Sequence, residues 1–246
     1  IMKKMIGIVG GVGSYAGIDI IKKIYDNTEA ITDQEHLPVS MLSAPHKVKD
    51  RTEYLIGKIK ENPGIAIAEI ITTLSRHGAE IIGIPCNTAH TPKIFNVIKQ
   101  NTPDEIQLVH LIEEVGKFIT NNHPEIKKVG VLSTNGTFIA DVYPSILANF
   151  GIEAIHPSEE IQKMFVHPAI YAQEYGIKAF SNPVKEKAKK DLLMAASYLS
   201  RKGSEAIILG CTEIPLAITE LQIEESLVID ATEVLAKALI RESTKE

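Results

Sequence analysis

The stretch GAEIIGIPCNT (78–88) decides how this chain folds, because a near copy of it, GSEAIILGCTE (203–213), follows 125 residues later. Each copy is an apolar run that ends at a cysteine and comes before a polar turn. Such a run, bounded by turn signals and alternating with helical patterns, is typical of a buried strand in a parallel sheet. Cys86 and Cys211 therefore occupy the same place in two related segments.

Two further pairs of segments repeat in the same order along the chain. IGIVGGVGSY (6–15) aligns with VGVLSTNGTF (129–138) at an offset of 123, and EEV (113–115) aligns with TEV (232–234) at an offset of 119. Three matches in one order at nearly constant offset predict two similar half-chains of about 120 residues each.

The fold class follows from the alternation of strand and helix patterns. We expect an α/β protein of two similar, doubly wound domains with mainly parallel sheets, related by a pseudo-two-fold axis. The first domain is predicted over residues 1–122 and the second over 123–230, and a helix over about 231–246 is expected to pack back on the first. Short runs rich in β-branched residues predict strands over residues 5–9, 39–43, 80–84, 108–111, 128–133, 153–156, 205–210 and 227–230.

Each cysteine is predicted to lie just after a strand and before a helix, at the carboxyl edge of its sheet. Open α/β sheets bind ligands along that edge. If the two halves face one another, the thiols of Cys86 and Cys211 line one cleft from opposite sides.

Composition limits the classes of partner. The chain has 246 residues, 44% of them hydrophobic and 23% charged, which is enough apolar material to bury a core. No run of eighteen apolar residues occurs, so no segment is expected to span a membrane. The opening IMKKMIGIVGG is predicted to be a first strand and not a secretion signal. A formal charge of −5 argues against a nucleic-acid partner, which needs a clustered positive surface.

Cysteine and histidine usage indicates the compartment and argues against a metal. Two cysteines without a CxxC pair favour free thiols in a reducing cytoplasm. The eight histidines form no HxxxH or HExxH pair, and the cysteines are too far apart for a zinc framework by spacing. We therefore expect no metal.

The glycine turn allows a different interpretation. GVGSYA (11–16) fits the GxGxxA pattern of dinucleotide-binding folds. Those folds usually carry an acid at the end of the second strand, whereas here LSAPHKV (42–48) precedes the first acid, Asp50. The turn, with Gly11 and Gly13, is therefore more simply interpreted as a close backbone approach to a substrate, followed by a helix whose N–H groups face the cleft.

The residues around the two cysteines favour chemistry over packing. Thr91 is predicted to cap the helix that follows Cys86, and a sulfur near a helix N-terminus is expected to favour the thiolate. The polar side chains of Asn87, Thr88 and Thr212 are suited to holding a substrate carboxylate.

A pair of cysteines on two faces of a cleft suggests proton transfer in and out. Removing a hydrogen from one face of a carbon and delivering another to the opposite face inverts the centre, and cysteine serves as both base and acid when its pKa lies near the working pH. The alternatives for a buried cysteine are plain packing and a regulatory disulfide.

Six segments resemble the cofactor-independent aspartate/glutamate racemase family, and most closely its aspartate racemase branch. The resemblance covers nearly the whole chain. PCNTAH and GCTEIP in that order are specific to the family, whereas the glycine turn alone is not. The segments are GIVGGVGSYAG (7–17), DRT (50–52), PCNTAH (85–90), LSTNGT (132–137), YGIKAF (175–180) and GCTEIP (210–215).

The resemblance implies an active-site cleft between the two domains. It also implies racemisation without pyridoxal phosphate or metal, so no cofactor is expected, and a homodimer as the assembly. It implies that Cys86 and Cys211 are the two acid/base thiols and that the substrate is a small acidic amino acid. The residues it assigns to binding that substrate are Arg51, Asn87, Thr88, Thr134, Lys178 and Thr212.

Several residues receive supporting or structural roles. Ser14 stands where relatives commonly carry proline, and we expect it to cap the following helix. His90 is a candidate support of the Cys86 loop, and Glu213 is a candidate to orient or activate Cys211, with a helix start as its alternative. His46, His110 and His167 are assigned to structure.

Two rival functions remain. One is a related isomerase, such as a hydantoin racemase, a maleate isomerase or an arylmalonate decarboxylase. The other is a non-catalytic binding protein for an acidic metabolite.

Overall fold

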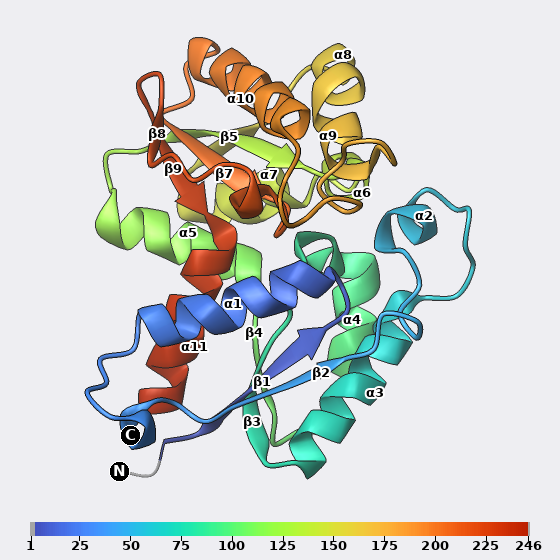
Figure 1. Cartoon of the computed structure of the whole chain (residues 1–246), viewed down its shortest axis with the longest axis vertical. Coiled ribbons are helices and arrows are strands. Elements are labelled where there is room, and N and C mark those ends of the chain that lie inside the picture. The colour runs from blue at the N-terminus through green and yellow to red at the C-terminus, as the bar shows by residue number, and fades with distance from the viewer. Residues whose placement is uncertain (1–2, 246) are drawn as a thin grey trace. The chain divides into compact units, whose positions relative to one another are not determined.

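The computed structural model describes residues 3–245, and the chain in it divides into two compact units. The first unit runs up to Glu114 and resumes at Thr232, and the second is Val115–Ala231. Each unit contains its own mainly parallel sheet with helices around it (Figure 1). This confirms the predicted mixed α/β class, and all eight predicted strands are present.

The first unit has a four-stranded parallel sheet in the order β2-β1-β3-β4. Its strands are β1 (Met5–Gly10), β2 (Val39–Ser43), β3 (Ala79–Gly83) and β4 (Gln107–Val109). Its helices are α1 (Ser14–Asp26), η1 (Asp33–Glu35), α2 (Arg51–Leu55), α3 (Pro63–Arg76), η2 (Asn87–His90), α4 (Pro92–Gln100) and α11 (Ala231–Thr244), and α5 (Leu111–Asn122) leads into the second unit.

Helices cover both faces of this first sheet. A Cβ atom added to Gly7 would lie 3.5 Å from Cβ of Leu74 in α3, and one added to Gly83 would lie 2.6 Å from Cδ1 of Leu239 in α11. Gly7 and Gly83 face opposite sides of the sheet, so α3 covers one face and α11 the other. Helices on both faces make the unit doubly wound.

The second unit has a five-stranded sheet in the order β6-β5-β7-β9-β8. Its strands are β5 (Lys128–Ser133), β6 (Glu153–Ile155), β7 (Ala206–Gly210), β8 (Gln222–Ile223) and β9 (Ser226–Asp230). Its helices are α6 (Asn135–Ile139), α7 (Val142–Leu147), η3 (Ala148–Phe150), α8 (Glu159–Ile161), the π-helical turn η4 (Gln162–Val166), α9 (His167–Tyr171), α10 (Glu186–Arg201) and η5 (Ile214–Leu216). The short strand β8 pairs antiparallel with β9 and was not expected from the sequence.

The two units repeat one topology, as the sequence offsets predict. The order β2-β1-β3-β4 of the first sheet recurs as β6-β5-β7-β9 in the second, and these strands are parallel throughout. In each sheet the chain reverses its direction of winding between the first and third strands, and ligands of open α/β sheets bind at such a switch point. Cys86 follows β3 and Cys211 follows β7, so each unit carries its cysteine beside this point.

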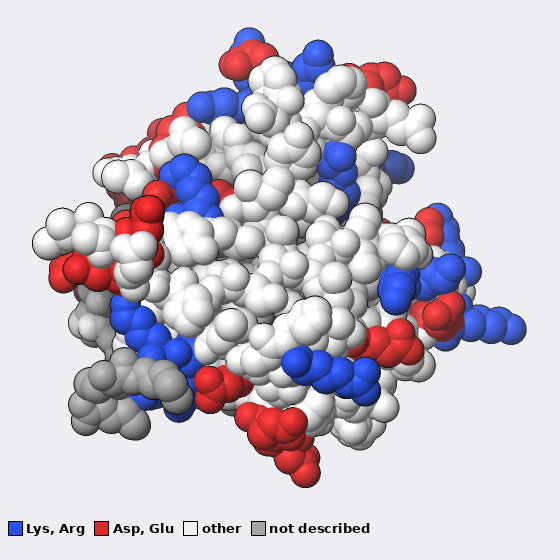
Figure 2. Space-filling model, turned by 60° about the horizontal axis from the view of Figure 1, so that its bottom comes forward, with Lys and Arg blue, Asp and Glu red and all other residues white. Residues whose placement is uncertain are grey.

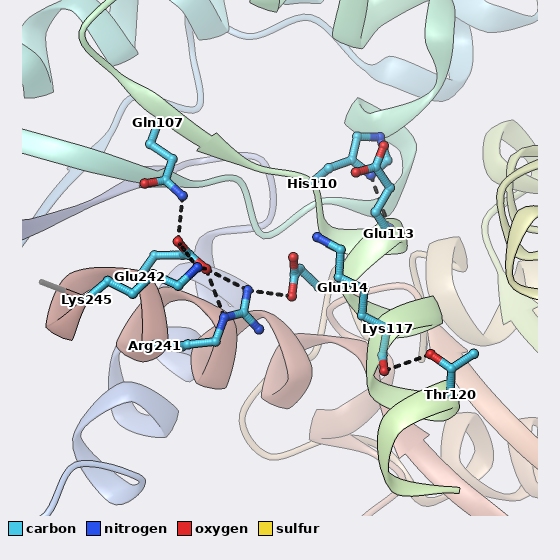
Figure 3. A network of polar contacts seen from close by, with 9 residues as sticks. All are labelled: Gln107, His110, Glu113, Glu114, Lys117, Thr120, Arg241, Glu242 and Lys245. Carbon is cyan, nitrogen blue, oxygen red and sulfur yellow. Dashed lines mark hydrogen bonds and ion pairs between the residues drawn. The ribbon is translucent and has the colours of Figure 1, made fainter. Parts of the chain in front are cut away.

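A network of charged side chains ties α11 to β4 and α5 (Figure 3). The buried Glu242 carboxylate accepts hydrogen bonds from Gln107 Nε2 at 2.8 Å, Lys245 Nζ at 2.7 Å and Arg241 Nε at 2.8 Å. Arg241 Nη2 also donates to Oε2 of the buried Glu114 at 2.9 Å. Burial alone would raise the pKa of Glu242, but the hydrogen bonds from Lys245, Gln107 and Arg241 outweigh it and lower this pKa to about 2.

We expect Glu242→Gln to lower the free energy of unfolding at pH 7 by about 2 kcal/mol, because the variant loses the carboxylate on which these donors converge. The folded-state pKa of Glu242 lies below its ordinary value of 4.5, so the ionised group contributes stability above that pH. This contribution is lost as the pH falls from about 4.5 through about 2. Urea unfolding between pH 2.5 and pH 7 measures it.

The matched control is Glu233→Gln on the same helix, because Glu233 pairs with Lys237 at 3.2 Å and is about a third exposed. Exposed pairs of this kind contribute less than about 1 kcal/mol. The variant Glu242→Gln should lose the acid-dependent part of its stability, while Glu233→Gln should keep it. Parallel pH curves for the two variants would contradict this role of Glu242.

The surface carries both signs of charge. On the face in Figure 2, lysine and arginine side chains are interspersed with aspartate and glutamate. This mixed pattern differs from the clustered positive surface that phosphate binding needs. Among the helices of residues 3–245, none combines the length and the apolar character required to cross a bilayer.

Candidate functional site

The glycine turn after β1 depends on backbone conformations that favour glycine. Gly11 has a φ of 80° and Gly13 a φ of 133°. Gly13 is the N-cap of α1, and no side chain caps this helix. The predicted capping role of Ser14 is therefore wrong, because Ser14 is already the first helical residue and its side chain is exposed.

Arg51 contacts this turn directly. Asp50 is the N-cap of α2 and accepts a hydrogen bond from the Glu53 amide at 2.8 Å, which fixes the start of the helix. From the first helical position, Arg51 Nη2 donates to the Val12 carbonyl at 3.1 Å and Nη1 donates to the Lys49 carbonyl at 3.3 Å. These bonds place the guanidinium beside the glycine turn, and α2 also packs against η2, the turn that follows Cys86.

Cys86 lies in a buried polar loop. It is the N-cap of η2 and is 6% exposed, and Asn87 and Thr88 beside it are buried as well. Thr91 holds the N-cap position of α4, as predicted, but its hydroxyl donates to the Thr88 carbonyl at 3.0 Å. The predicted side-chain cap is therefore wrong, since this hydroxyl closes the preceding turn.

His90 fixes the backbone of this loop. Its Nδ1 is 2.9 Å from the Cys86 carbonyl, so this nitrogen donates, and its ring stacks on Phe95 and meets His110 edge-on. Burial, together with the neighbouring His110, lowers the pKa of His90 to about 3. The imidazole is therefore neutral at physiological pH and holds the loop without carrying charge.

In the second unit, Thr134 follows β5 as Cys211 follows β7. The sheet register pairs Ser133 with Gly210, so Thr134 and Cys211 leave adjacent strands at the same level. Thr134 is the N-cap of α6, and its Oγ1 accepts from the Thr137 amide at 3.4 Å.

Gln162 is a residue that sequence reasoning missed. It is buried in the π-helical turn and donates to the Ser133 carbonyl at 3.0 Å and to Asn135 Oδ1 at 2.9 Å. These bonds fix the loop after β5 from a distant part of the chain. The sequence around Gln162 carries no signal of this contact.

Cys211 is hydrogen-bonded in series with two charged side chains, Glu213 and Lys178. Its Sγ donates to Glu213 Oε2 at 3.1 Å, and Glu213 Oε1 accepts from Lys178 Nζ at 2.5 Å. Cys211 and Glu213 are each only 4% exposed. Burial and the negative charge of Glu213 raise the pKa of the Cys211 thiol well above its ordinary value, although Lys178 lowers it. The expectation that this sulfur favours the thiolate is therefore wrong.

The segment YGIKAF folds back on α9 and brings Lys178 to this place. The amides of Ile177 and Lys178 donate to the carbonyls of Ala169 at 2.8 Å and Ile170 at 3.1 Å. Gly176 allows the return, because a Cβ there would lie 2.6 Å from the Ala172 amide nitrogen. The Lys178 ammonium also lies 5.6 Å from the centre of the Tyr171 ring.

Tyr143 is a second residue that the sequence did not single out. It is fully buried, and burial together with the charges of Cys211 and Asp230 raises its pKa far above its ordinary value. Its phenol therefore keeps its proton, and it forms part of the surroundings of Cys211. A tyrosine in an apolar helix pattern gives no sign of this position.

The remaining candidates have simple positions. Thr212 is buried next to Cys211, His46 is exposed, and His167 stacks on Tyr171. Both cysteines are free thiols. Within residues 3–245, no three His, Cys, Asp or Glu side chains gather as a metal site would need.

Comparison with known proteins identifies the class. The family model described as "Asp/Glu/Hydantoin racemase" matches residues 9–239. The chain is 26% identical over 242 residues to the "Broad specificity amino-acid racemase RacX" of Bacillus subtilis (strain 168), covering 96% of each. It is 24% identical to a "Glutamate racemase" of Limosilactobacillus reuteri, over 89% of this chain and 72% of that protein.

A solved structure supports the same class. The "Picrophilus torridus aspartate racemase" is 28% identical, with a TM-score of 0.80, and the match covers 99% of this chain and 95% of that one. The protein is therefore an isomerase of the amino-acid racemase class. The chain belongs to the Asp/Glu/hydantoin racemase family, which confirms the resemblance found in its sequence.

Proposed function

We propose that this protein interconverts the L and D forms of aspartate, and secondarily glutamate, by proton transfer between Cys86 and Cys211. The observation that carries the proposal is the repeated position of the two thiols. In each unit a buried cysteine follows the third strand of the same strand order, among hydrogen-bonding side chains. Packing alone does not require a thiol at both equivalent positions.

In the proposed reaction, one cysteine as thiolate takes the α-hydrogen, and the S–H bond forms as the C–H electron pair passes to the carbon and its carboxylate. The other cysteine then gives its proton to the opposite face of that carbon and becomes the thiolate. Charge builds up on the α-carboxylate during this step, so preorganised donors at that carboxylate supply most of the stabilisation. The scheme needs no cofactor, and it requires both units to present their thiols to one substrate molecule.

The donors proposed for the substrate come from both sheets. Asn87 and Thr88 are assigned to the α-carboxylate, with Thr134 and Thr212 as neighbours. Arg51 is assigned to the side-chain carboxylate, because its planar guanidinium binds carboxylates in a bidentate fashion. Its bond to the Val12 carbonyl keeps the guanidinium beside the glycine turn before substrate arrives.

Incubation with a panel of substrates, resolved on a chiral column, tests this function. L-aspartate and L-glutamate should each approach an equal mixture of enantiomers, aspartate faster, while maleate and allantoin should stay unchanged. Conversion of maleate or allantoin alone would assign the chain to a related isomerase. Tight calorimetric binding of aspartate without turnover would indicate a binding protein.

We also expect a cytoplasmic homodimer, and light scattering of the purified protein tests the assembly.

A further inference from the structure

We infer that the Glu213–Lys178 pair holds the proton on Cys211 between turnovers, so that the resting enzyme acts on the enantiomer whose α-hydrogen faces Cys86, with Cys211 as the proton donor. The reverse conversion starts from the Cys211 thiolate. This inference rests on the proposed function for its chemical consequence, but its physical content concerns one thiol in one unit. Glu213 and Lys178 are then positioning residues. Lys178 acts on the sulfur through the carboxylate and not on the substrate.

The geometry uses both oxygens of a single buried carboxylate. Oε2 of Glu213 accepts from the thiol at 3.1 Å, and Oε1 accepts from the Lys178 ammonium at 2.5 Å. The Glu213 carboxylate is only 4% exposed, and Lys178 is the cation that balances its negative charge. A neutral thiol satisfies Oε2 with a hydrogen bond, whereas a thiolate at the same distance would place two negative charges in contact.

Two more groups lie in these surroundings. Tyr143 from α7 is fully buried, and burial together with the charges of Cys211 and of Asp230 at the end of β9 raises the pKa of its phenol. Burial and Glu213 raise the pKa of Cys211, and Lys178 opposes them without cancelling them. The surroundings therefore stabilise the protonated sulfur.

This arrangement has a consequence for catalysis. An α-hydrogen is weakly acidic, so a thiolate of high basicity is an effective base once it forms. When Cys211 has given its proton to the carbon, Glu213 repels the new thiolate, which favours its reprotonation by solvent. Within one turnover the S–H bond broken at Cys211 matches the S–H bond formed at Cys86, and the resting state returns when Cys86 releases its proton to solvent.

The test measures the titration of the Cys211 thiol directly. The intact protein is alkylated with iodoacetamide across a pH series, and the Cys211 peptide is quantified by mass spectrometry, with the Cys86 peptide as the internal reference. In Glu213→Gln the midpoint should fall by about one pH unit, which makes alkylation about tenfold faster at a fixed pH below the midpoint. In Lys178→Met the midpoint should rise, because Glu213 is ionised at alkaline pH and has lost its cation.

Two further variants separate charge from structure. Lys178→Arg keeps the cation and should restore a titration close to that of the unmodified chain. Lys189→Met removes a more exposed ion pair of the same unit, Lys189–Glu220 at 2.8 Å, and should leave the Cys211 midpoint unchanged. If Glu213→Gln does not fold, Glu213→Asp withdraws the carboxylate by one methylene and should lower the midpoint by a smaller amount. An unchanged midpoint in the Glu213 variant, or a fall in Lys178→Met, overturns the inference.

The kinetic measurement distinguishes this role of Lys178 from substrate binding. A positioning role predicts a lower kcat with a shifted pH profile and an unchanged KM for aspartate in Lys178→Met. A rise in KM alone would return Lys178 to the substrate carboxylate and overturn its role at the thiol. If no substrate of the panel is racemised, the proposed function fails, while the alkylation midpoints still decide the state of Cys211.

Discussion

Replacing Cys86 or Cys211 by alanine is expected to reduce racemisation of aspartate by about 10³-fold or more. Each thiol is proposed as a general acid or base, and removal of such a group commonly costs 10²- to 10⁴-fold. The two variants should be equally inactive for net conversion, because inversion needs a group on each face of the carbon. Rates in both directions are measured on a chiral column.

Exchange of the α-hydrogen in deuterium oxide separates this scheme from a general loss of structure. In Cys211→Ala the remaining Cys86 should still exchange the α-hydrogen of one enantiomer without inverting it, and Cys86→Ala should exchange that of the other enantiomer. Each substitution removes one small buried side chain and should cost about 1 kcal/mol of stability, which urea unfolding checks. Undiminished racemisation in either variant would contradict the two-base scheme. Exchange of the same enantiomer by both variants would contradict the placement of the two thiols on opposite faces of the α-carbon.

The fold was largely predictable because its signals are local and repeated. The eight parallel strands are apolar runs bounded by turn residues, and the offsets along the chain indicate two units of one topology. The short strand β8 escaped prediction for a physical reason. Its hairpin to β9 turns through Glu224 at a φ of 51°, where a glycine or asparagine would have given a sequence signal.

The sequence predicts where the candidate site residues lie, but it does not predict their protonation states. Sequence offsets alone bring Cys86 and Cys211 to equivalent positions beside the switch points. The state of Cys211 depends on burial and on distances to Glu213 and Lys178, and Lys178 lies 33 residues earlier in the chain. No spacing rule encodes these distances. Two hydrogen bonds to backbone carbonyls could not be predicted either: Arg51 to Val12, and Gln162 to Ser133. Every residue has a backbone carbonyl, so the sequence does not show which one accepts.

Gly11→Ala is expected to lower the free energy of unfolding by about 3 kcal/mol, from two separate physical costs. At a φ of 80° an alanine is strained by about 1 kcal/mol relative to glycine. The added Cβ would also lie 2.6 Å from the backbone nitrogen of Pro45 and 3.0 Å from the backbone of Ala44. Backbone atoms cannot rotate away as a flexible side chain does, so the turn itself must shift, at a cost of about 2 kcal/mol.

Gly57→Ala is the matched control, since Gly57 has nearly the same φ of 79° but no atom within 4 Å of an added Cβ among the described residues. It should therefore lose only about 1 kcal/mol, and urea unfolding of both variants measures the difference, which isolates the steric part. Because Arg51 Nη2 bonds to the Val12 carbonyl, displacement of this turn should also raise the KM for aspartate in Gly11→Ala and leave it unchanged in Gly57→Ala. Equal losses of stability in the two variants would mean that the turn yields freely, and Arg51 would then be positioned by α2 alone.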